Sequence, residues 1–383
     1  MPSFRSSWLG VMAMALALLF VPLASAVAIE TAAREAILID DSTGAVLFEK
    51  NADQRMPPSS MSKIMTVYMV FSRLAEGSLS LDDTLPVSEK AWRMGGSKMF
   101  VEVGTRVSIE DLIQGIVVQS GNDATIVVAE GLSGSEQAFV DELNAMARKI
   151  GLKDSTFKNA SGWPDEGHLT TARDLAHLAR RTIHDFPQYY KYYGEKSFTY
   201  NGIRQGNRNP LLYRNIGADG VKTGHTQIAG YGLTASAVRD GRRLILVVNG
   251  LKSVRERGVE AERLLEYGFR EFRNYSLFKP GDSVTEADVW LGDQATVPLI
   301  VERPVVVSLR RRARPKLEVK VVYDGPIPAP IMRGQRLATM TISAPDIDPV
   351  AIPLVAGDDI GKLSMFRRIG AAISYLAWGA SAR

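Results

Sequence analysis

Three pairs of a serine and a lysine, spaced three residues apart, could each supply an activated hydroxyl group. They are Ser60–Lys63, Ser155–Lys158 and Ser276–Lys279. Residues i and i+3 share one face of a helix, so the amine can lie beside the hydroxyl. A serine needs a base to become a nucleophile. A lysine serves as that base when burial or a second cation lowers its pKa from about 10.4 toward neutrality.

The position of Ser60 in the chain distinguishes its pair from the other two. Pro57-Pro58 precedes it, and the apolar residues from Met61 to Met69 recur at helical spacing. We therefore expect the Ser60 hydroxyl at the N-terminus of a helix, where backbone N–H groups stabilise negative charge. The other two pairs lie in a polar connection and directly before a proline.

Two further short sequences occur once each and carry polar groups suited to a substrate. Ser120-Gly121-Asn122 interrupts an apolar helical stretch, and Lys222-Thr223-Gly224 leads into two strand-like runs. The cation and hydroxyl of the second could hold a carboxylate, and Gly224 would let a substrate backbone approach closely. Taken singly, the first is equally well explained as a turn between helices and the second as a polar strand entry.

The three sequences, in this order, resemble the signature of class A β-lactamases and penicillin-binding proteins. The Ser-Gly-Asn form is similar to that of D-alanyl-D-alanine carboxypeptidases, the low-molecular-mass penicillin-binding proteins. The flanking residues in 58–66, 120–124 and 219–226 also resemble this family, and the resemblance covers nearly the whole mature chain. Trp163 departs from it, since a leucine is expected after Ser161-Gly162.

The resemblance implies roles for the residues that would do the chemistry. Ser60 would attack the carbonyl of the penultimate D-alanine in a peptidoglycan stem peptide, and Lys63 would take its proton. Ser120 would relay a proton toward the leaving D-alanine, and Asn122 would bond the substrate or Lys63. Water would then release the acyl-enzyme. β-Lactams would acylate the same serine, and no cofactor is implied.

The resemblance also implies which residues would bind the substrate. Lys222 and Thr223 would bind the terminal carboxylate beside Gly224, and Arg257 would assist them. The backbone N–H groups of Ser60 and His225 would form the oxyanion hole, whose donors typically contribute about 3–4 kcal/mol each.

The elements around these residues predict an α/β (or α+β) domain of the β-lactamase/transpeptidase-like type. Hairpins are expected over 36–49 and around Asp240-Gly241. Helical patterns cover 59–74, 109–131, 135–150, 171–184 and 259–273. Strands at both ends of a largely helical middle favour one sheet that is built from both termini and flanked by helices.

The composition of the chain changes near Tyr275, which divides the catalytic region from a second domain. Short strand-like runs between Pro, Gly and Asp predict a small all-β sandwich or barrel. The basic run 310–316 is interpreted as a solvated turn. We expect a signal peptide over 1–26, a catalytic domain over 27–275, an all-β domain over 276–358 and an amphipathic membrane-anchor helix over 359–383.

The two ends of the chain suggest export and attachment to a membrane surface. An apolar run after Arg5 ends in Ala24-Ser25-Ala26, the pattern of a signal peptidase site, although an uncleaved anchor would also fit. In the last segment, apolar residues such as Phe366 and Ile373 share one helical face, and cations lie largely off it. Such a helix can lie in a bilayer interface but is too polar to span it. A helix packed on the β domain is the alternative.

Composition excludes several other classes of protein. The chain has no cysteine, so disulfides, cysteine-ligated zinc and a thiol nucleophile are excluded. Of its four histidines, His177 and His184 could share a helix face, but no carboxylate or third ligand clearly joins them, so no metal site is predicted. The net charge of +4 over 383 residues does not support a nucleic-acid partner.

These observations lead to one hypothesis with three alternatives. The chain is interpreted as a D-Ala-D-Ala carboxypeptidase on the periplasmic face of the cell inner membrane. A β-lactamase or a DD-endopeptidase is the alternative within the same chemistry. A non-catalytic peptidoglycan-binding protein is the alternative from another class, but such a protein would have no need of Lys63.

Overall fold

The computed structural model describes residues 29–345 and 347–364. The predicted signal peptide and residues 365–383 of the predicted amphipathic helix lie outside the described residues.

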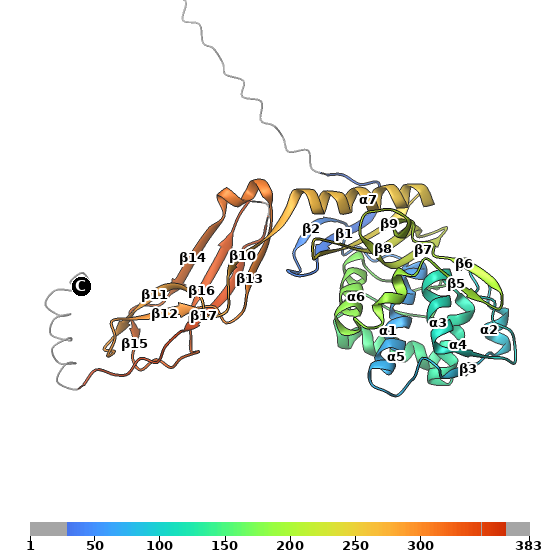
Figure 1. The fold of residues 1–383 in the computed structure, drawn as a ribbon, viewed down its shortest axis with the longest axis horizontal. Helices are drawn as coiled ribbons and strands as arrows, with labels where there is room; N and C mark the ends of the chain where they lie inside the picture. Colours follow the sequence, from blue (N-terminus) through green and yellow to red (C-terminus); the bar gives the residue numbers. More distant parts are fainter. Residues whose placement is uncertain (1–28, 346, 365–383) are drawn as a thin grey trace, which may run out of the picture. The chain divides into compact units, whose positions relative to one another are not determined.

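A five-stranded antiparallel sheet lies at the centre of the first part of the chain (Figure 1). The strand order is β2-β1-β9-β8-β7, so strands from the N-terminal side pair with strands that come much later. This confirms the prediction of one sheet built from both ends of the region. The strands are β1 (Glu35–Asp40), β2 (Val46–Lys50), β7 (Ala218–Thr226), β8 (Gly230–Arg239) and β9 (Arg242–Leu251).

The two predicted hairpins of this sheet are present. The first joins β1 to β2 through Asp41–Ala45. The second joins β8 to β9, with Asp240 and Gly241 at φ values of 49° and 74°. Positive φ at both central residues is what a two-residue hairpin of this twist requires, which is why an Asp-Gly pair predicts it.

Helices cover both faces of the sheet (Figure 1). Helix α7 (Val254–Glu271) packs on β8 and β9, and helix α6 (Ala172–Asp185) packs on β1 and β9 from the opposite side. The remaining helices lie on the α6 side; they are α1 (Lys63–Ala75), α2 (Glu89–Arg93), α3 (Ile109–Gln114), α4 (Asn122–Ser133) and α5 (Glu136–Ile150).

Short elements complete this part of the chain. Two strand pairs lie outside the main sheet, β3 (Thr84–Pro86) with β4 (Arg106–Ser108) and β5 (Ser197–Tyr200) with β6 (Ile203–Gly206). The single-turn helices are η1 (Ser59–Ser62), η2 (Gly115–Gln119), η3 (Tyr190–Gly194) and η4 (Pro210–Tyr213).

Helix α1 is the central helix of the hydrophobic core. Every residue from Lys63 to Phe71 is buried. A helix that is apolar on all sides lies in the core. Lys63 is the first residue of this helix and is therefore buried as well. The preceding 3₁₀ turn, Ser59–Ser62, contains Ser60, so the predicted helix over 59–74 divides into a tight turn followed by α1. We call this turn the serine turn.

The second part of the chain is an all-β unit with a core of its own. A six-stranded sheet has the order β14-β16-β17-β12-β11-β15, and β10 pairs with β13 beside it. Buried residues such as Val289, Leu299 and Met340 form its core. The elements are β10 (Phe272–Phe278), β11 (Ser283–Trp290), β12 (Thr296–Ile300), β13 (Val305–Arg310), η5 (Arg311–Lys316), β14 (Glu318–Tyr323), β15 (Ile327–Pro328), β16 (Arg336–Ser343) and β17 (Val350–Ala356).

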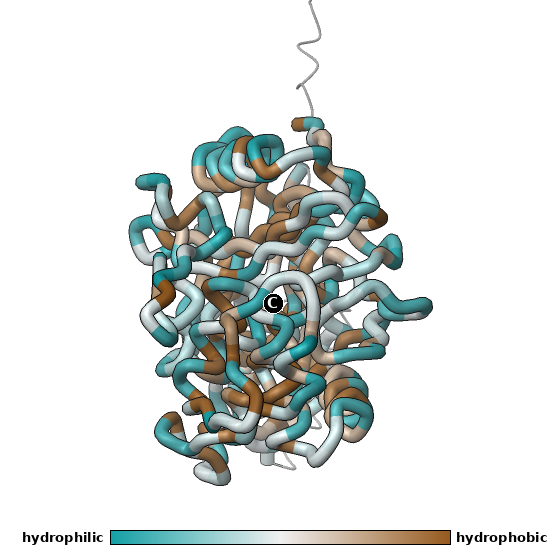
Figure 2. The backbone as a smooth tube through the Cα atoms, turned by 90° about the vertical axis from the view of Figure 1, so that its right-hand side faces the viewer, coloured by the Kyte–Doolittle hydropathy of each residue, from teal (hydrophilic) through white to brown (hydrophobic). Residues whose placement is uncertain are grey.

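Hydrophilic residues occupy many of the outer turns, which are drawn in teal in Figure 2. The basic run 311–316 forms the 3₁₀ helix η5, which is largely exposed except for the buried Ala313. Among the described residues, no helix has both the length and the apolar character needed to cross a membrane.

A buried carboxylate, Asp40, joins the end of β1 to several other elements. It accepts hydrogen bonds from the Ser42 hydroxyl, the Arg242 Nε group and the Asn274 amide. The Arg242 guanidinium also donates to the carbonyl of Phe272 at the start of β10. Burial alone would raise the pKa of Asp40, but the bonds from Ser42 and Arg242 outweigh it and lower that pKa.

We predict that Asp40→Ala lowers the free energy of unfolding by about 3–5 kcal/mol, because Arg242 would keep its buried charge without a partner. Urea denaturation measures this, with the exposed Asp324→Ala as the matched control. A loss below about 1 kcal/mol would show that Asp40 does not hold these elements together.

Candidate active site

The serine turn and α1 place the amine of Lys63 beside the hydroxyl of Ser60. Lys63 Nζ and Ser60 Oγ are 2.9 Å apart. Lys63 Nζ also donates to Asn122 Oδ1 over 2.7 Å and to the carbonyl of Ser161 over 2.6 Å. The structure therefore brings together three of the residues that the sequence singled out.

The Lys63 amine has the environment of a base. The side chain is fully buried, and this burial lowers its pKa to about 7. The positive charge of Arg208 lowers the pKa further, whereas Asp123 opposes the shift. A neutral amine has two N–H groups and one lone pair. Asn122 and Ser161 accept the two N–H bonds, which leaves the lone pair for the Ser60 hydroxyl.

Ser120 and Asn122 lie where one helical stretch ends and the next begins. The turn η2 closes at Ser120, which is buried and has a left-handed φ of 68°. Asn122 is the first residue of α4, and its Nδ2 group donates to the carbonyl of Gly95. The carbonyl oxygen and the NH2 group of this side-chain amide are thus both engaged, the first with Lys63 and the second with a neighbouring loop.

Asp123 is a residue of the site that sequence reasoning missed. Its carboxylate accepts backbone N–H groups from Met99, Phe100 and Val101. Buried backbone donors need partners, so Asp123 fixes the loop that borders Asn122. In the sequence, Asp123 is marked only as an acidic residue in the first turn of a helix. Such a residue ordinarily stabilises the N-terminus of its own helix.

Cations gather around the predicted carboxylate site on β7. Lys222, Thr223 and Arg257 are all buried, and Lys222 Nζ donates to the carbonyl of Thr223. Burial lowers the pKa of Lys222, and the like charges of Lys63, Arg208 and Arg257 lower it further. Within the described residues, none of these cations forms a salt bridge with an acidic side chain. Such a cluster favours the binding of an anion.

Arg208 is the second functional residue that the sequence did not indicate. It is exposed, donates to the hydroxyl of Ser97, and its carbonyl accepts a bond from Arg257. Its charge acts on both Lys63 and Lys222. It lies in a connection with no periodic pattern, so its proximity to the lysines could be seen only in the folded chain.

Gly224 and His225 follow Lys222 and Thr223 along β7. The ring of His225 is exposed and stacks on Tyr231 at a centroid distance of 3.8 Å, and the Arg257 guanidinium lies 5.7 Å from the Tyr231 centroid. A Cβ atom on Gly224 would lie 3.0 Å from the carbonyl oxygen of Pro58. Gly224 therefore lets β7 approach the serine turn, and the approach of a substrate backbone at this residue stays a prediction.

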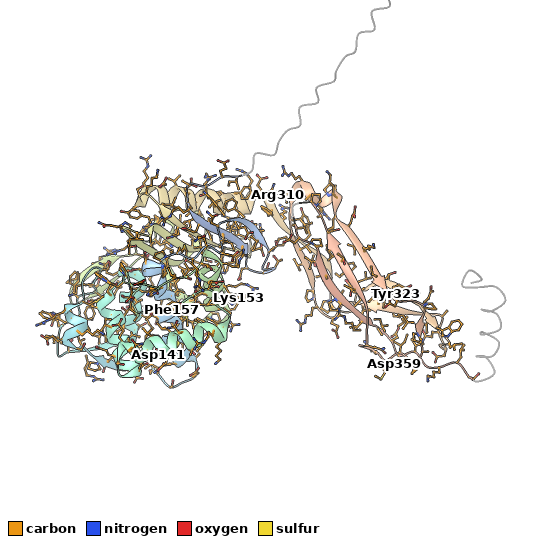
Figure 3. All side chains as sticks on the ribbon, turned by 180° about the vertical axis from the view of Figure 1, so that it is seen from behind. Asp141, Lys153, Phe157, Arg310, Tyr323 and Asp359 are labelled. Atoms are coloured by element: carbon orange, nitrogen blue, oxygen red, sulfur yellow. The ribbon has the colours of Figure 1, made fainter. Side chains whose placement is uncertain are left out.

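The histidines are engaged elsewhere and do not activate Ser60. His168 pairs with Ser62 Oγ over 2.8 Å and lies at the edge of the Phe157 ring, which Figure 3 labels. Burial lowers the pKa of His168 to about 4. His177 bonds a backbone carbonyl and His184 bonds Asp41. Within the described residues, no group of three His, Asp or Glu side chains could hold a metal ion.

A buried amine beside a serine hydroxyl is an arrangement suited to acyl transfer, and comparison with known proteins gives the family. Residues 23–253 match the family described as D-alanyl-D-alanine carboxypeptidase. Residues 272–365 match the family described as penicillin-binding protein 5, C-terminal domain.

Individual relatives extend over most of the chain. D-Alanyl-D-alanine carboxypeptidase DacC of Escherichia coli (strain K12) is 38% identical, over 88% of this chain and 86% of the relative. Penicillin binding protein 5 from Haemophilus influenzae has a similar structure, with a TM-score of 0.79, 35% identity, and coverage of 88% of this chain and 99% of the other. Penicillin-binding protein D2 from Listeria monocytogenes, solved in its ampicillin-bound form, has a TM-score of 0.59 and 30% identity, over 63% of this chain and 99% of the other.

The chain belongs to the D-alanyl-D-alanine carboxypeptidase family. It is an enzyme of this serine-peptidase type, as the sequence predicted. The predicted fold class is confirmed as well, with a mixed α/β domain followed by a β-sheet domain.

We predict that Arg208→Gln moves the acidic limb of the pH–rate profile to higher pH. Only the neutral amine of Lys63 can take a proton, so acylation rises with pH through the pKa of Lys63, near 7 in the native enzyme. Removal of the Arg208 charge raises that pKa. The measurement is the second-order rate of acylation by a fluorescent penicillin between about pH 5 and 10.

The exposed Arg303, which lies in the β-sheet domain, provides the matched control. Arg303→Gln should leave the position of the limb unchanged. If Arg208→Gln slows the reaction equally at every pH, then Arg208 affects binding alone and does not tune Lys63.

Proposed function

We propose that this enzyme removes the terminal D-alanine from peptidoglycan stem peptides through an acyl-enzyme on Ser60. The observation that carries this proposal is the buried amine of Lys63, 2.9 Å from Ser60 Oγ, with its pKa lowered to about 7. An amine that is neutral near physiological pH acts as a general base, which ordinarily accelerates a reaction by about 10²–10⁴-fold.

In the first step, Lys63 takes the hydroxyl proton while Ser60 Oγ bonds to the carbonyl carbon of the penultimate D-alanine. The backbone N–H groups of Ser60 and His225 stabilise the oxyanion that forms. Lys63 gives this proton to Ser120, which passes its own proton to the nitrogen of the leaving D-alanine as the peptide bond breaks. In the second step, water attacks the ester, Lys63 takes a proton from the water, and it returns this proton to Ser60 Oγ as the ester bond breaks.

The cluster of cations on and beside β7 selects the substrate end that carries a free carboxylate. Lys222, Thr223 and Arg257 bind that carboxylate, and its negative charge compensates the buried cations. Asn122 keeps Lys63 in place. A β-lactam carries a comparable carboxylate and a reactive carbonyl, so we propose that it acylates Ser60 in the same way.

The test is covalent labelling by fluorescent penicillin together with release of D-alanine from a pentapeptide that ends in D-Ala-D-Ala. Ser60→Ala should abolish both, and Lys63→Gln should slow labelling by about 10²–10⁴-fold. Ser72→Ala, which lies on α1 with Lys63 but away from the site, is the matched control. Labelling that survives in Ser60→Ala would refute the assignment, and labelling without release of D-alanine would refute the carboxypeptidase activity.

We also propose that the enzyme is exported and lies on the periplasmic face of the inner membrane. The small-residue cleavage pattern at Ala24–Ala26 supports a signal peptide over 1–26, followed by a catalytic domain over 27–275 and a β domain over 276–358. The basic amphipathic pattern within 359–383 supports a peripheral anchor.

The anchor is tested by truncation after Ser364, because Lys362 and Leu363 still pair with the β domain at Gly292 and Leu291. The truncated protein should leave the membrane fraction while still being labelled by penicillin. Arg367→Glu with Arg368→Glu should weaken binding to anionic vesicles, since each cation near such a surface contributes about 1 kcal/mol. Continued sedimentation of the truncated protein with membranes would rule out this anchor.

A further inference from the structure

An open cavity of about 670 Å³ lies where helix α7 ends and strand β10 begins. The β8–β9 hairpin and the last turns of α7 form part of its wall, and η5 contributes Arg311. The residues proposed for catalysis and for carboxylate binding do not line it. Its volume is within the range typical of ligand pockets. The cavity is therefore separate from the candidate active site and large enough to hold a ligand group.

Arginine is the commonest residue type in the wall of this cavity. We call it the arginine cavity, after its lining residues Arg239, Arg242, Arg270, Arg273 and Arg311.

Three of these arginines have acidic partners inside the protein. Arg239 pairs with Glu266, Arg242 with Asp40, and Arg270 with Glu271. The remaining acidic residue of the wall is Asp240, at the tip of the hairpin.

The other two arginines are available to a ligand. Arg273 and Arg311 are both exposed, and neither forms a salt bridge with an acidic side chain of the described chain. They come from different elements, β10 and η5, and border one cavity. Two guanidinium groups that share a cavity can bind one anion together or two neighbouring anions.

The 3₁₀ helix η5 adds further cations beside Arg311. It contains no acidic residue, and its Arg312, Arg314 and Lys316 are all exposed. The guanidinium of Arg314 lies 4.8 Å from the centre of the Tyr275 ring on β10, which fixes the helix against that strand. The stretch that the sequence predicts as a solvated turn thus forms a helix that holds positive charge beside the cavity.

The place of η5 in the β-sheet domain separates these cations from the end of the domain that leads to the proposed anchor. Strand β14 leads from η5 toward β15, and its six residues span about 20 Å. Strand β15 pairs with the last residues of β11, and the next residue, Leu291, accepts a bond from the N–H group of Leu363. Figure 3 labels Arg310, which precedes η5, and Asp359, close to Leu363, at opposite ends of this domain. The cavity therefore lies away from the membrane surface that the anchor would bind, which favours the wall polymer as its ligand.

We propose that the arginine cavity is a second binding site for peptidoglycan and holds carboxylates of stem peptides other than the one being cleaved. Arg273 and Arg311 donate bidentate bonds to these carboxylates, and the cations of η5 attract the strand. A strand held at the cavity raises the concentration of its other stem peptides near Ser60. This inference rests on the proposed carboxypeptidase function, because that function identifies the polymer.

The test compares the native chain with Arg273→Gln and Arg311→Gln combined. Binding to purified peptidoglycan sacculi is measured by sedimentation and should weaken about tenfold at low salt, since two exposed ion pairs contribute up to about this factor. Release of D-alanine from dilute sacculi should fall similarly, whereas kcat/KM for a soluble pentapeptide should not change. Salt at about 0.5 M should remove the difference in binding, because exposed charges are screened.

Matched controls separate the cavity from general effects of charge. Arg303→Gln with Arg336→Gln removes two exposed arginines of the same β-sheet domain that do not line the cavity, and should change neither binding nor release. Labelling by fluorescent penicillin reports whether each variant is folded. Should the double variant fail to fold, Arg311→Gln alone carries the same test with a smaller loss.

Two further materials identify the ligand. Sacculi whose carboxylates have been converted to amides with a carbodiimide and ammonia should bind the native chain no better than they bind the double variant. Vesicles of phosphatidylglycerol present phosphate groups on a lipid surface, and they should bind the native chain and the double variant equally.

The possible outcomes distinguish this inference from the function on which it rests. Equal binding of the native chain and the double variant to untreated sacculi would refute the second site, and so would a native advantage that survives amidation. Weaker binding of the double variant to vesicles but not to sacculi would assign these cations to lipid and also overturn the inference. If the native chain releases no D-alanine from the pentapeptide, the carboxypeptidase function fails, while the binding comparison still decides whether the cavity holds peptidoglycan.

Discussion

The candidate site depends on one interaction, the contact between the buried amine of Lys63 and the hydroxyl of Ser60, the proposed nucleophile. An amine in water is protonated near pH 7 and cannot accept a proton from serine. Burial of Lys63 at the start of α1 reverses this by penalising the charged form. The burial in turn requires a helix that is apolar on all sides, surrounded by other helices and by one face of the sheet. The packing of the core around α1 therefore also keeps the Lys63 nitrogen away from water.

The cations on and beside β7, Lys222, Arg257 and Arg208, have two effects. In the proposed function they bind a carboxylate, and one of them, Arg208, also makes the protonated form of Lys63 less favourable. A bound carboxylate would offset their field, so substrate binding and the basicity of Lys63 are coupled. Asp123 takes part in the same balance, because it raises the pKa of Lys63 while holding the loop beside Asn122.

The sequence predicted the features that local patterns encode. Turn residues such as Asp240-Gly241 and the helical periodicity after Pro57-Pro58 located the hairpins and α1, and the short motifs located Ser60, Lys63 and Asn122. Strands β10 and β15 were not predicted, since the first directly continues a helical pattern and the second has only two residues.

Features set by tertiary contact were missed for a different reason. Arg208 acts on Lys63 through space, and Asp123 acts through backbone donors that become buried only on folding. The space around Gly224 is occupied by the serine turn, which no local pattern reveals. Conversely, Trp163 was recognised in the sequence as an unusual residue, but only the structure gives it a neighbouring cavity.

The order of strands in the central sheet has a consequence for how the enzyme is made. Strand β1 pairs with β9, and the hydrogen-bonded residues Glu35 and Asn249 are 214 positions apart in the chain. Until β9 has emerged, the β1–β2 hairpin keeps an unpaired edge, and unpaired edges invite association with other chains. Contacts of such long range are also slow to form. The helices can become ordered as they emerge, but β7 joins this sheet only through β8 and β9, so the nucleophile gains its neighbours on β7 late in folding.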